Sequence, residues 1–450
     1  MKKRHLWNLI SGGLILSSLP LSVISCSNQD SEQQKDSSIS NFVEKNDRIS
    51  VIETNSSLNY DAIKDKKGIK IALINGSGNT LDKSFNQSHW EALIKLSEDT
   101  RKDDKNQIEI TDINPGTTEL TEVYNNALEE NQKVWVLAGY NHSEKIKAYL
   151  KNEENVKKLN EKGVIIIAVD FQVGLENTSN FKNLYEVTFN INEAAYIVGN
   201  ALSKAFAKTF PGQNNSDSRK SGVYGGGSGS DVVSFISGYL KGILKYNKSS
   251  ETTNKINQID QIALNAGYEA GDPNMNQVTI GMIDKKPKFV LPVVAGGVAI
   301  ILDEIQKRNL DMYVIGVDVD QSKAYPQHKG KFATSIQKNI GQAVYDVINE
   351  FVFGIKNKSL ESKASSTEYG SKHLHGNFSD KWVAYAPSTA SNEKLRLAIN
   401  NELEKTEKEF LKLTNAEKDF ISNFKDSSNK EYSEESLSEL VEALVKEINK

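Results

Sequence analysis

The 450-residue chain contains a single cysteine, Cys26, and no basic stripe. One cysteine excludes a disulfide within one chain, so the fold must be stabilised by its core alone. The 55 Lys and Arg residues are mixed with 59 Asp and Glu residues, which gives a formal net charge of −4. Because nucleic-acid-binding proteins gather their positive charge on one surface, this mixture argues against a nucleic-acid partner.

The sequence also lacks the short motifs of common catalytic and metal sites. It contains no G-x-S-x-G, no H-E-x-x-H and no complete P-loop. His373 and His375 could in principle bind a metal, but their polar flanks favour a solvated loop. Asp318 and Asp320 do not start a calcium loop, because the required glycine and glutamate are missing. We therefore expect no catalytic residue, no metal and no cofactor, and hence no enzyme.

The start of the chain has the layout of a secretory signal. Three basic residues precede a mostly apolar run over 6–25, which is typical of a signal peptide. The sequence Val-Ile-Ser-Cys at 23–26 resembles the lipobox of bacterial lipoproteins. This resemblance implies cleavage after residue 25 and a diacylglycerol thioether, with palmitate-type acyl chains, on Cys26. The alternative is an ordinary signal peptide followed by an incidental cysteine.

Residues 27–50 contain few large apolar side chains, so we expect a flexible tether over 26–65. Beyond the signal, no apolar run is long enough to span a bilayer. The body is therefore expected at the extracytoplasmic face of the cell membrane, held there by lipid on Cys26.

From residue 66, short apolar runs alternate with segments of helical periodicity. Continuous apolar strands are typical of parallel sheets covered by helices on both faces, so this pattern predicts an α/β fold. The expected strands are 68–75, 107–113, 132–138, 163–169, 184–190, 221–225, 258–265, 287–294 and 312–317. The expected helices are 85–100, 118–131, 143–161, 193–209, 231–246, 274–284 and 297–309.

This number of strands favours two lobes over one sheet. We expect an N-terminal lobe at 66–190 and a C-terminal lobe at 191–332. Parts of 333–372 and of 373–405 complete the N-terminal and C-terminal lobes, respectively. Residues 406–450 are charged, with apolar positions at helical spacing, and predict a helical extension that packs on the body or contacts a partner.

Polar residues follow several of the expected strands, at the sheet edge where α/β proteins bind ligands. After the first strand, Asp82 and Asn86 flank Phe85, which is a candidate flat platform; the alternative is a helix start with Phe85 in the core and Asp82 as a surface cap. Asp170 and Asp318 each follow an apolar strand and could accept hydrogen bonds from a ligand, although Asp170 could instead cap a turn.

Glycines occur in two further stretches. The run 225–229 lacks G-x-G-x-x-G spacing, so it indicates close backbone packing beside a cleft rather than a dinucleotide site. The Ala-Gly-Gly sequence at 295–297, which includes Gly296, is interpreted in the same way.

Several stretches, in order along residues 66–405, resemble the basic membrane protein family of ABC-transporter substrate-binding lipoproteins, the relatives of purine nucleoside receptor A. The most specific are Asp-Lys-Ser-Phe-Asn-Gln at 82–87 and Gly-Val-Asp-Val-Asp-Gln at 316–321. The resemblance implies a two-lobed periplasmic-binding fold of the first type, made of two parallel sheets flanked by helices. A ligand cleft would lie between the lobes, and crossover strands would hinge them.

The resemblance also implies roles for residues. Phe85 would stack on a base, Asn86 and Asp170 would bind its edge, and Asp318 with Lys338 would hold ribose hydroxyls. The family's second aromatic ring falls at 291–293, where this chain has Leu, Pro and Val, and Phe289 lies too early. Tyr268, from another loop, is the candidate replacement.

The sequence is compatible with three functions. The first is a membrane-anchored receptor that binds a nucleoside, most simply a purine nucleoside, and delivers it to an ABC permease. The second is a receptor for a sugar or another small polar solute. The third is a surface lipoprotein or adhesin with vestigial ligand binding.

Overall fold

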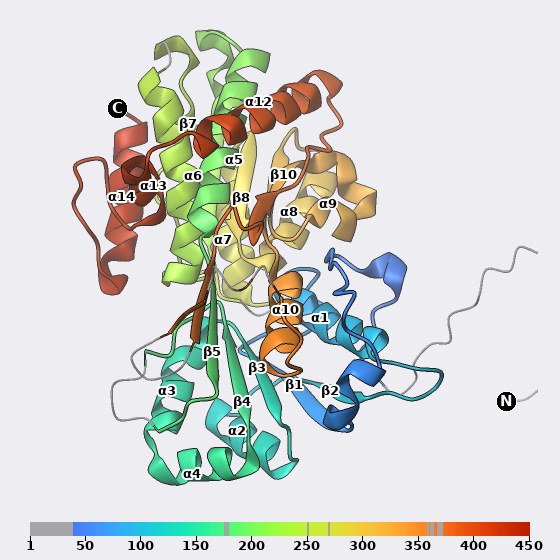
Figure 1. The fold of residues 1–450 in the computed structure, drawn as a ribbon. Helices are drawn as coiled ribbons and strands as arrows, with labels where there is room; N and C mark the ends of the chain where they lie inside the picture. The colour runs from blue at the N-terminus through green and yellow to red at the C-terminus, as the bar shows by residue number, and fades with distance from the viewer. Residues whose placement is uncertain are drawn as a thin grey trace, which may run out of the picture. The chain divides into compact units, whose positions relative to one another are not determined.

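The computed structural model describes residues 39–174, 180–249, 252–268, 271–357, 360, 364–366 and 372–450. Residues 39–450 form one compact unit that contains two sheets, each with helices packed on it (Figure 1). Cys26 and the predicted signal peptide at 1–25 lie outside the described residues. Within the described ranges, no helix combines the length and the apolarity needed to cross a bilayer.

The N-terminal sheet has the strand order β11-β12-β5-β4-β3-β1-β2. All its neighbouring strands are parallel except β11 and β12. The bounds are β1 Ile69–Asn75, β2 Ile108–Ile113, β3 Val134–Ala138, β4 Ile165–Val169, β5 Leu184–Phe189, β11 Ala364–Ser366 and β12 Lys372–Gly376.

The C-terminal sheet has the order β13-β10-β9-β8-β6-β7 and is parallel except for the β10–β13 pair. The bounds are β6 Lys220–Gly225, β7 Asn257–Gln258, β8 Phe289–Val293, β9 Tyr313–Asp318, β10 Phe332–Lys338 and β13 Val383–Tyr385. The predicted α/β class and the two parallel sheets are therefore confirmed.

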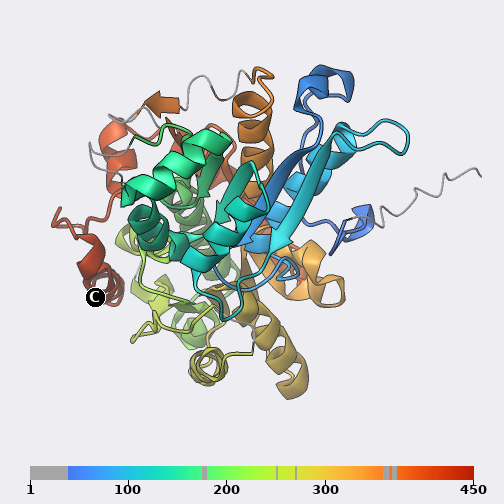
Figure 2. The same cartoon turned by 90° about the horizontal axis from the view of Figure 1, so that it is seen from below.

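Helices cover both faces of each sheet, because alternate strand residues point to opposite faces. In β1, Ile71 and Leu73 pack with α1 and α10, while Ala72 and Ile74 pack with α2, α3 and α4. Figures 1 and 2 show α10, in orange, beside the blue N-terminal elements. The bounds are α1 Phe85–Asp99, α2 Leu120–Glu129, α3 Ser143–Lys151, α4 Glu153–Lys162 and α10 Ile340–Phe351.

The C-terminal sheet follows the same rule, with α5 and α6 on one face and α7 and α8 on the other. The chain then continues through α12, which packs on α5, through α13, which contacts both α5 and α6, and through α14, which packs on α6. The bounds are α5 Ile191–Thr209, α6 Ser230–Ser249, α7 Pro273–Asp284, α8 Ala295–Arg308, α9 Gln321–Ala324, α12 Glu393–Leu411, α13 Asn415–Ser422 and α14 Leu437–Ile448. Of the predicted alternatives for the C-terminal extension, packing on the body is the one observed.

Three described segments connect the lobes: β5 to α5, β10 to α10, and β12 to β13. They lie side by side, since the Asn190 amide donates to the Gly376 carbonyl at 2.8 Å and the Asn339 amide donates to the Trp382 carbonyl at 2.8 Å. Parallel connections of this kind are the expected hinge of a two-lobed receptor.

The lobe boundaries differ from the predicted ones. The C-terminal lobe was expected to reach residue 332 before the chain returned, but β10 continues to Lys338 and pairs with β9 in the C-terminal sheet. Conversely, β12 lies at the start of 373–405, part of which was expected in the C-terminal lobe, but it pairs with β5 in the N-terminal sheet. Each crossing therefore comes directly after a strand, where the preceding residues remain hydrogen-bonded to their sheet.

The predicted extent of the flexible tether needs correction. Residues 39–65 pack on the body of the protein, and four of their apolar side chains are buried: Val43, Ile49, Leu58 and Ile63. Ile49 packs with Val319 and Ala324, which follow β9 in the C-terminal lobe. The amides of Ile49 and Ser50 donate to the carboxylate of Glu91 at 3.0 and 2.7 Å. A few well-spaced apolar side chains and these backbone hydrogen bonds are enough to hold the segment.

Two predicted elements are also different. The single helix expected at 143–161 is two helices, because Asn152 lies between them and its side chain accepts from the amides of Glu154 and Asn155. The strand expected at 258–265 is reduced to β7, since Gln261 adopts a left-handed φ of 58° that interrupts extended backbone.

Candidate functional site

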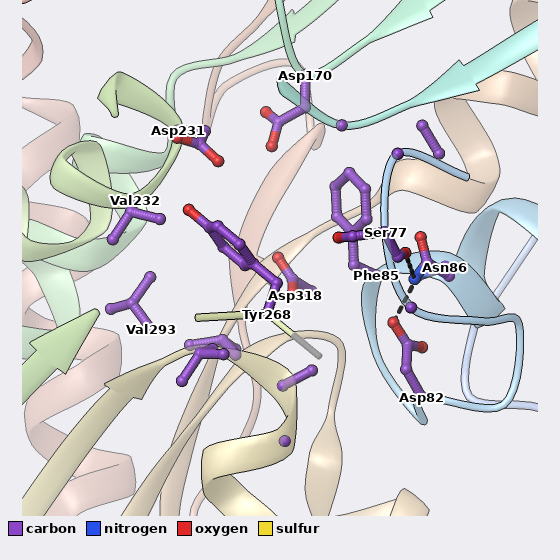
Figure 3. Close-up of a pocket in the computed structure, with 18 of the residues that line it drawn as sticks. Ser77, Asp82, Phe85, Asn86, Asp170, Asp231, Val232, Tyr268, Val293 and Asp318 are labelled. Atoms are coloured by element: carbon purple, nitrogen blue, oxygen red, sulfur yellow. Dashed lines mark hydrogen bonds between the residues drawn. The ribbon is translucent and has the colours of Figure 1, made fainter. Parts of the chain in front are cut away.

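A cavity of about 440 Å³ lies between the carboxyl ends of the two sheets (Figure 3). This volume falls within the range of about 300–1,000 Å³ that is common for small-molecule sites. The structure brings all eight predicted ligand-binding residues together on its wall: Asp82, Phe85, Asn86, Asp170, Tyr268, Gly296, Asp318 and Lys338.

Asp82 organises the loop that follows β1. Its carboxylate accepts hydrogen bonds from the backbone amides of Ser84, Asn86 and Gln87, at 2.9, 2.9 and 3.1 Å. Asn86 and Gln87 belong to the first turn of α1 and Ser84 directly precedes it, so the carboxylate acts as a helix cap, as the alternative interpretation stated for Asp82. That interpretation placed Phe85 in the core, whereas Phe85 lines the cavity. Asp82 thereby fixes the position of Phe85, which lies between its partners.

Phe85 is half-buried, and its ring points into the cavity (Figure 3). The ring of His89 packs against it edge-to-face, with centroids 4.6 Å apart. Gly139 has a φ of 99°, and a Cβ there would lie 3.4 Å from the Phe85 ring. Glycine at 139 therefore provides a positive φ that other residues rarely adopt, whereas a Cβ would only touch the ring. Asn86, next along the helix, donates from its side-chain amide to the Ser77 carbonyl at 3.0 Å.

Tyr268 enters the cavity from the C-terminal lobe, and Figure 3 shows its ring on the side facing Phe85. A Cβ on Gly226 or Gly227 would lie 2.7 or 2.4 Å from the tyrosine side chain. The predicted close packing at these glycines is therefore the space that the ring of Tyr268 needs. Burial, together with the carboxylates of Asp231 and Asp170, raises the pKa of its hydroxyl.

The apolar stretch in β8 has a different role from the aromatic wall expected there. Phe289 is fully buried in the core and stacks on Phe206, with centroids 4.3 Å apart, so it does not reach the cavity. Val293 lines the cavity, as does Gly296. A Cβ on Gly296 would lie 2.7 Å from the sulfur of Met275, so a larger residue would require the wall to shift.

Lys338 is the buried cation of the site. Its Nζ lies 2.5 Å from Oδ2 of Asp170 and 4.9 Å from the centroid of the Phe235 ring. Burial alone would lower the pKa of Lys338, but the carboxylates of Asp170, Asp318 and Asp231 outweigh it and raise that pKa. The ammonium group therefore stays charged in the presence of these carboxylates.

Asp170 and Asp318 occupy matching positions in the two lobes. Asp170 directly follows β4, Asp318 ends β9, and both have left-handed backbones, with φ of 71° and 65°. Aspartate tolerates this conformation better than most residues, and strained backbone of this kind clusters at ligand sites. The turn aims each carboxylate into the space between the sheets.

Asp318 also links the lobes. The Ser84 hydroxyl, at the start of α1, donates to Oδ2 of Asp318 at 3.0 Å. Burial raises the pKa of Asp318 to about 6, Lys338 opposes this shift, and the nearby Asp170 adds to it. The polar end of the cavity is therefore crowded with carboxylates that share one lysine.

Some wall residues were missed by the sequence analysis. Asp231 is the second residue of α6, which begins at Ser230, whereas β6 already ends at Gly225. A glycine-rich loop therefore separates Asp231 from its strand, so it lacks the strand-end position that identified Asp170 and Asp318. Burial and the Asp170 carboxylate raise the pKa of Asp231 to about 6. The aromatic residues that were missed lie on other loops and helices and carry no motif: Tyr140, Phe235 and Tyr325.

The histidine pair lies away from this cavity, on β12. The Thr188 hydroxyl lies 2.7 Å from Nε2 of His373 and 2.8 Å from Nδ1 of His375. The solvated loop predicted for this pair is therefore wrong, because the two residues are part of a sheet. Among the described residues, no group of three or more His, Cys, Asp or Glu side chains converges as metal ligands would.

Known proteins match the chain in sequence and in fold. A Basic membrane protein B from Borreliella burgdorferi is 28% identical over 289 residues, which cover 64% of this chain and 74% of that protein. The ABC transporter nucleoside-binding protein BmpA of Lactococcus lactis subsp. cremoris is 27% identical over 300 residues, covering 64% and 76%.

An ABC transporter solute-binding protein from Aeropyrum pernix K1 has a crystal structure that superposes with a TM-score of 0.57. The match covers 85% of this chain and 98% of that one at 13% identity, so it supports the shared two-lobed fold alone.

The family described as Bmp, ABC transporter substrate-binding protein PnrA-like, matches residues 69–373, which include every residue that lines the cavity and all strands of the two sheets except β13 and most of β12. This chain therefore belongs to the Bmp family of PnrA-like ABC-transporter substrate-binding proteins.

Proposed function

We propose that the protein is a lipid-anchored receptor that binds a nucleoside, with a purine base, between its lobes and passes it to an ABC permease. The observation that carries this proposal is that one cavity has both an aromatic part and a charged part. The rings of Phe85 and Tyr268 face it from different lobes, and Lys338 with its carboxylates lies at its polar end.

The aromatic walls suit a flat base. A base placed between Phe85 and Tyr268 would cover both rings, and stacking contributes about 1–3 kcal/mol per base. Asn86 and Asp170 lie on the same wall and would meet polar atoms at the edge of the base. Because Phe85 and Tyr268 come from different lobes, a stacked base would favour the arrangement that brings the lobes together.

The polar end suits a ribose. A carboxylate can accept hydrogen bonds from two neighbouring hydroxyls at once, and Asp318, which lines the cavity, would take this role. Lys338 can donate to a ring or hydroxyl oxygen while its remaining contact with Asp170 holds it in place. The named relative from Lactococcus lactis, a nucleoside-binding protein, supports this assignment.

A sugar receptor is the second candidate. The cluster formed by Asp170, Asp231 and Asp318 would also accept hydroxyls from a free pentose or hexose. The two candidates differ in how the ligand would contact the aromatic rings. A planar base can stack on both rings, whereas a sugar is not aromatic and cannot stack in this way.

A thermal-shift panel separates these candidates. Purified protein is heated with each of adenosine, guanosine, inosine, uridine, the free bases, ribose and arabinose. A ligand that binds only the folded state raises the melting temperature, and a concentration of 100 Kd contributes about 2.7 kcal/mol. The proposal expects shifts from purine nucleosides that exceed those from bases or pentoses. Shifts from pentoses alone would favour the sugar receptor, and no shift from any nucleoside would refute the proposal.

A further inference from the structure

The C-terminal segment 412–450 lies beyond the family match, which ends at residue 373. It nevertheless forms part of the C-terminal lobe, with α14 alongside α6 (Figure 1). Six apolar side chains of α14 are buried: Leu437, Leu440, Val441, Leu444, Val445 and Ile448.

Hydrogen bonds fix the segment at both ends. Lys241, buried in α6, donates to the carbonyls of Phe420 and Asn423 at 2.7 and 2.6 Å, where α13 ends. At the other end, the side chain of Asn449 accepts from the Gln258 amide at 3.0 Å and donates to the Gln258 carbonyl at 2.8 Å. The segment is therefore held in a defined position relative to α6.

Between these anchors, Glu434 reaches the start of α6. Its Oε1 accepts a hydrogen bond from the Ser230 amide at 2.8 Å. The first amides of a helix have no partner within the helix, so a carboxylate there both satisfies a donor and stabilises the helix dipole. Ser230 directly precedes Asp231 and Val232, which line the ligand cavity (Figure 3).

Glu434 also lies at the place where the two lobes meet. A Cβ on Gly229 would lie 3.8 Å from Oε1 of Glu434 and 3.8 Å from the ring of Tyr140, which lines the cavity from the N-terminal lobe. The carboxylate of Glu434 is therefore close both to the start of α6 in the C-terminal lobe and to the part of the cavity wall that the N-terminal lobe supplies.

We propose that Glu434 is a positioning residue of the ligand site, through which the C-terminal segment sets the affinity of the cavity. Glu434 holds the first turn of α6, and this turn presents Asp231 and Val232 to the ligand. The inference rests on the proposed function for its effect on nucleoside affinity, but the contact with α6 is testable without a ligand.

The test compares Glu434→Ala, Glu434→Gln and a control, Glu442→Ala, in the purified protein. Glu442 lies on the exposed side of α14, with a side chain 71% exposed and an ion pair to Lys446 at 3.7 Å. Glutamine keeps an acceptor for the Ser230 amide but loses the charge. The readouts are amide hydrogen exchange at residues 230–236 without ligand, and calorimetric titration with adenosine and guanosine.

We expect Glu434→Ala to speed exchange at 230–236 and to weaken nucleoside binding by about 5- to 10-fold, the lower range of coupling between sites. Glu434→Gln should restore part of both, and Glu442→Ala should change neither. Unchanged exchange in Glu434→Ala would overturn the contact, and faster exchange with unchanged affinity would overturn its role in the site. If the unsubstituted protein binds neither nucleoside, the proposed function fails, and the exchange result alone supports or overturns the contact.

Discussion

Nζ of Lys338 lies 2.5 Å from Oδ2 of Asp170, although Lys338 ends a strand of the C-terminal sheet and Asp170 follows a strand of the N-terminal sheet. The two side chains are only 3% and 10% exposed. A buried ion pair of this kind contributes little net stability, but removing one partner leaves an uncompensated charge. Because the pair joins the two lobes inside the cavity, the way the lobes come together depends on the charges in the cavity.

Replacing Lys338 with methionine should greatly weaken nucleoside binding. Asp170, Asp231 and Asp318 would then share the cavity without their cation, so bringing the lobes together would bury carboxylates that repel one another. We expect a loss of about 100-fold in affinity by calorimetry, since breaking a buried charge pair costs roughly 2–5 kcal/mol. Lys307→Met, on the exposed face of α8, is the matched control. Equal affinity in Lys338→Met and the control would remove Lys338 from the site.

Phe85→Ala should reduce nucleoside affinity by about 10- to 100-fold, because the loss of one stacked ring costs roughly 1–3 kcal/mol. Phe85→Leu retains an apolar side chain without the flat face, so it should recover little of the loss. Circular dichroism and melting temperature check that both variants fold. An affinity that is unchanged in Phe85→Ala would show that the base does not stack there.

Asp318→Asn should weaken binding of ribosides more than binding of the free bases. The carboxylate can accept from two hydroxyls, whereas the amide offers a single acceptor oxygen. The same variant should lose less affinity for a 2′,3′-dideoxynucleoside, which lacks both hydroxyls. Calorimetry with guanosine, guanine and dideoxyguanosine measures these differences. Equal losses for all three would argue against a ribose contact at Asp318.

Asp231 should make the stability of the unliganded protein depend on pH. Burial raises its pKa from 3.8 to about 6, so the folded state binds this proton more tightly than the unfolded state between those values. Its contribution to stability therefore falls as pH rises from about 4 to about 6, when the buried carboxyl group ionises.

Asp231→Asn removes this penalty. Its stability relative to the unsubstituted protein should be greater at pH 7 than at pH 4, by about 1–3 kcal/mol. Urea unfolding at the two pH values measures the difference. A stability difference that is the same at both values would mean that Asp231 titrates normally.

Cys26→Ser should abolish lipid attachment. We propose this cysteine as the attachment point because the sequence at 23–26 resembles a lipobox, and two acyl chains hold a protein at a membrane where a single chain does not. Labelled palmitate supplied to cells that express the protein measures incorporation. Continued labelling of Cys26→Ser would place the lipid on another residue.

Most of the sheet-forming strands could be predicted from the sequence because they are buried on both faces. The strand β3 and the strand β8 have no exposed residue, so each appears as a continuous apolar run. The short strands at the crossings were harder to predict. The sequence of β12, for example, contains Lys372 and two histidines, and it becomes a strand because its backbone pairs with β5.

The residues of the candidate site also differ in how well they could be predicted from the sequence. Asp170 and Asp318 could be found because each follows an apolar strand, which is a local signal. Tyr268 could be proposed only by elimination, because its position depends on the space left by Gly226 and Gly227, about forty residues earlier in the chain. Glu434 could not be predicted at all, since its contact with Ser230 depends on how α14 packs against α6.

A crystal structure of the protein grown with guanosine or adenosine tests the central claim most directly. The account predicts a base between the rings of Phe85 and Tyr268, with the ribose hydroxyls on Asp318 and close to Lys338. A nucleoside bound away from both rings, or an empty cavity at millimolar nucleoside, would contradict it.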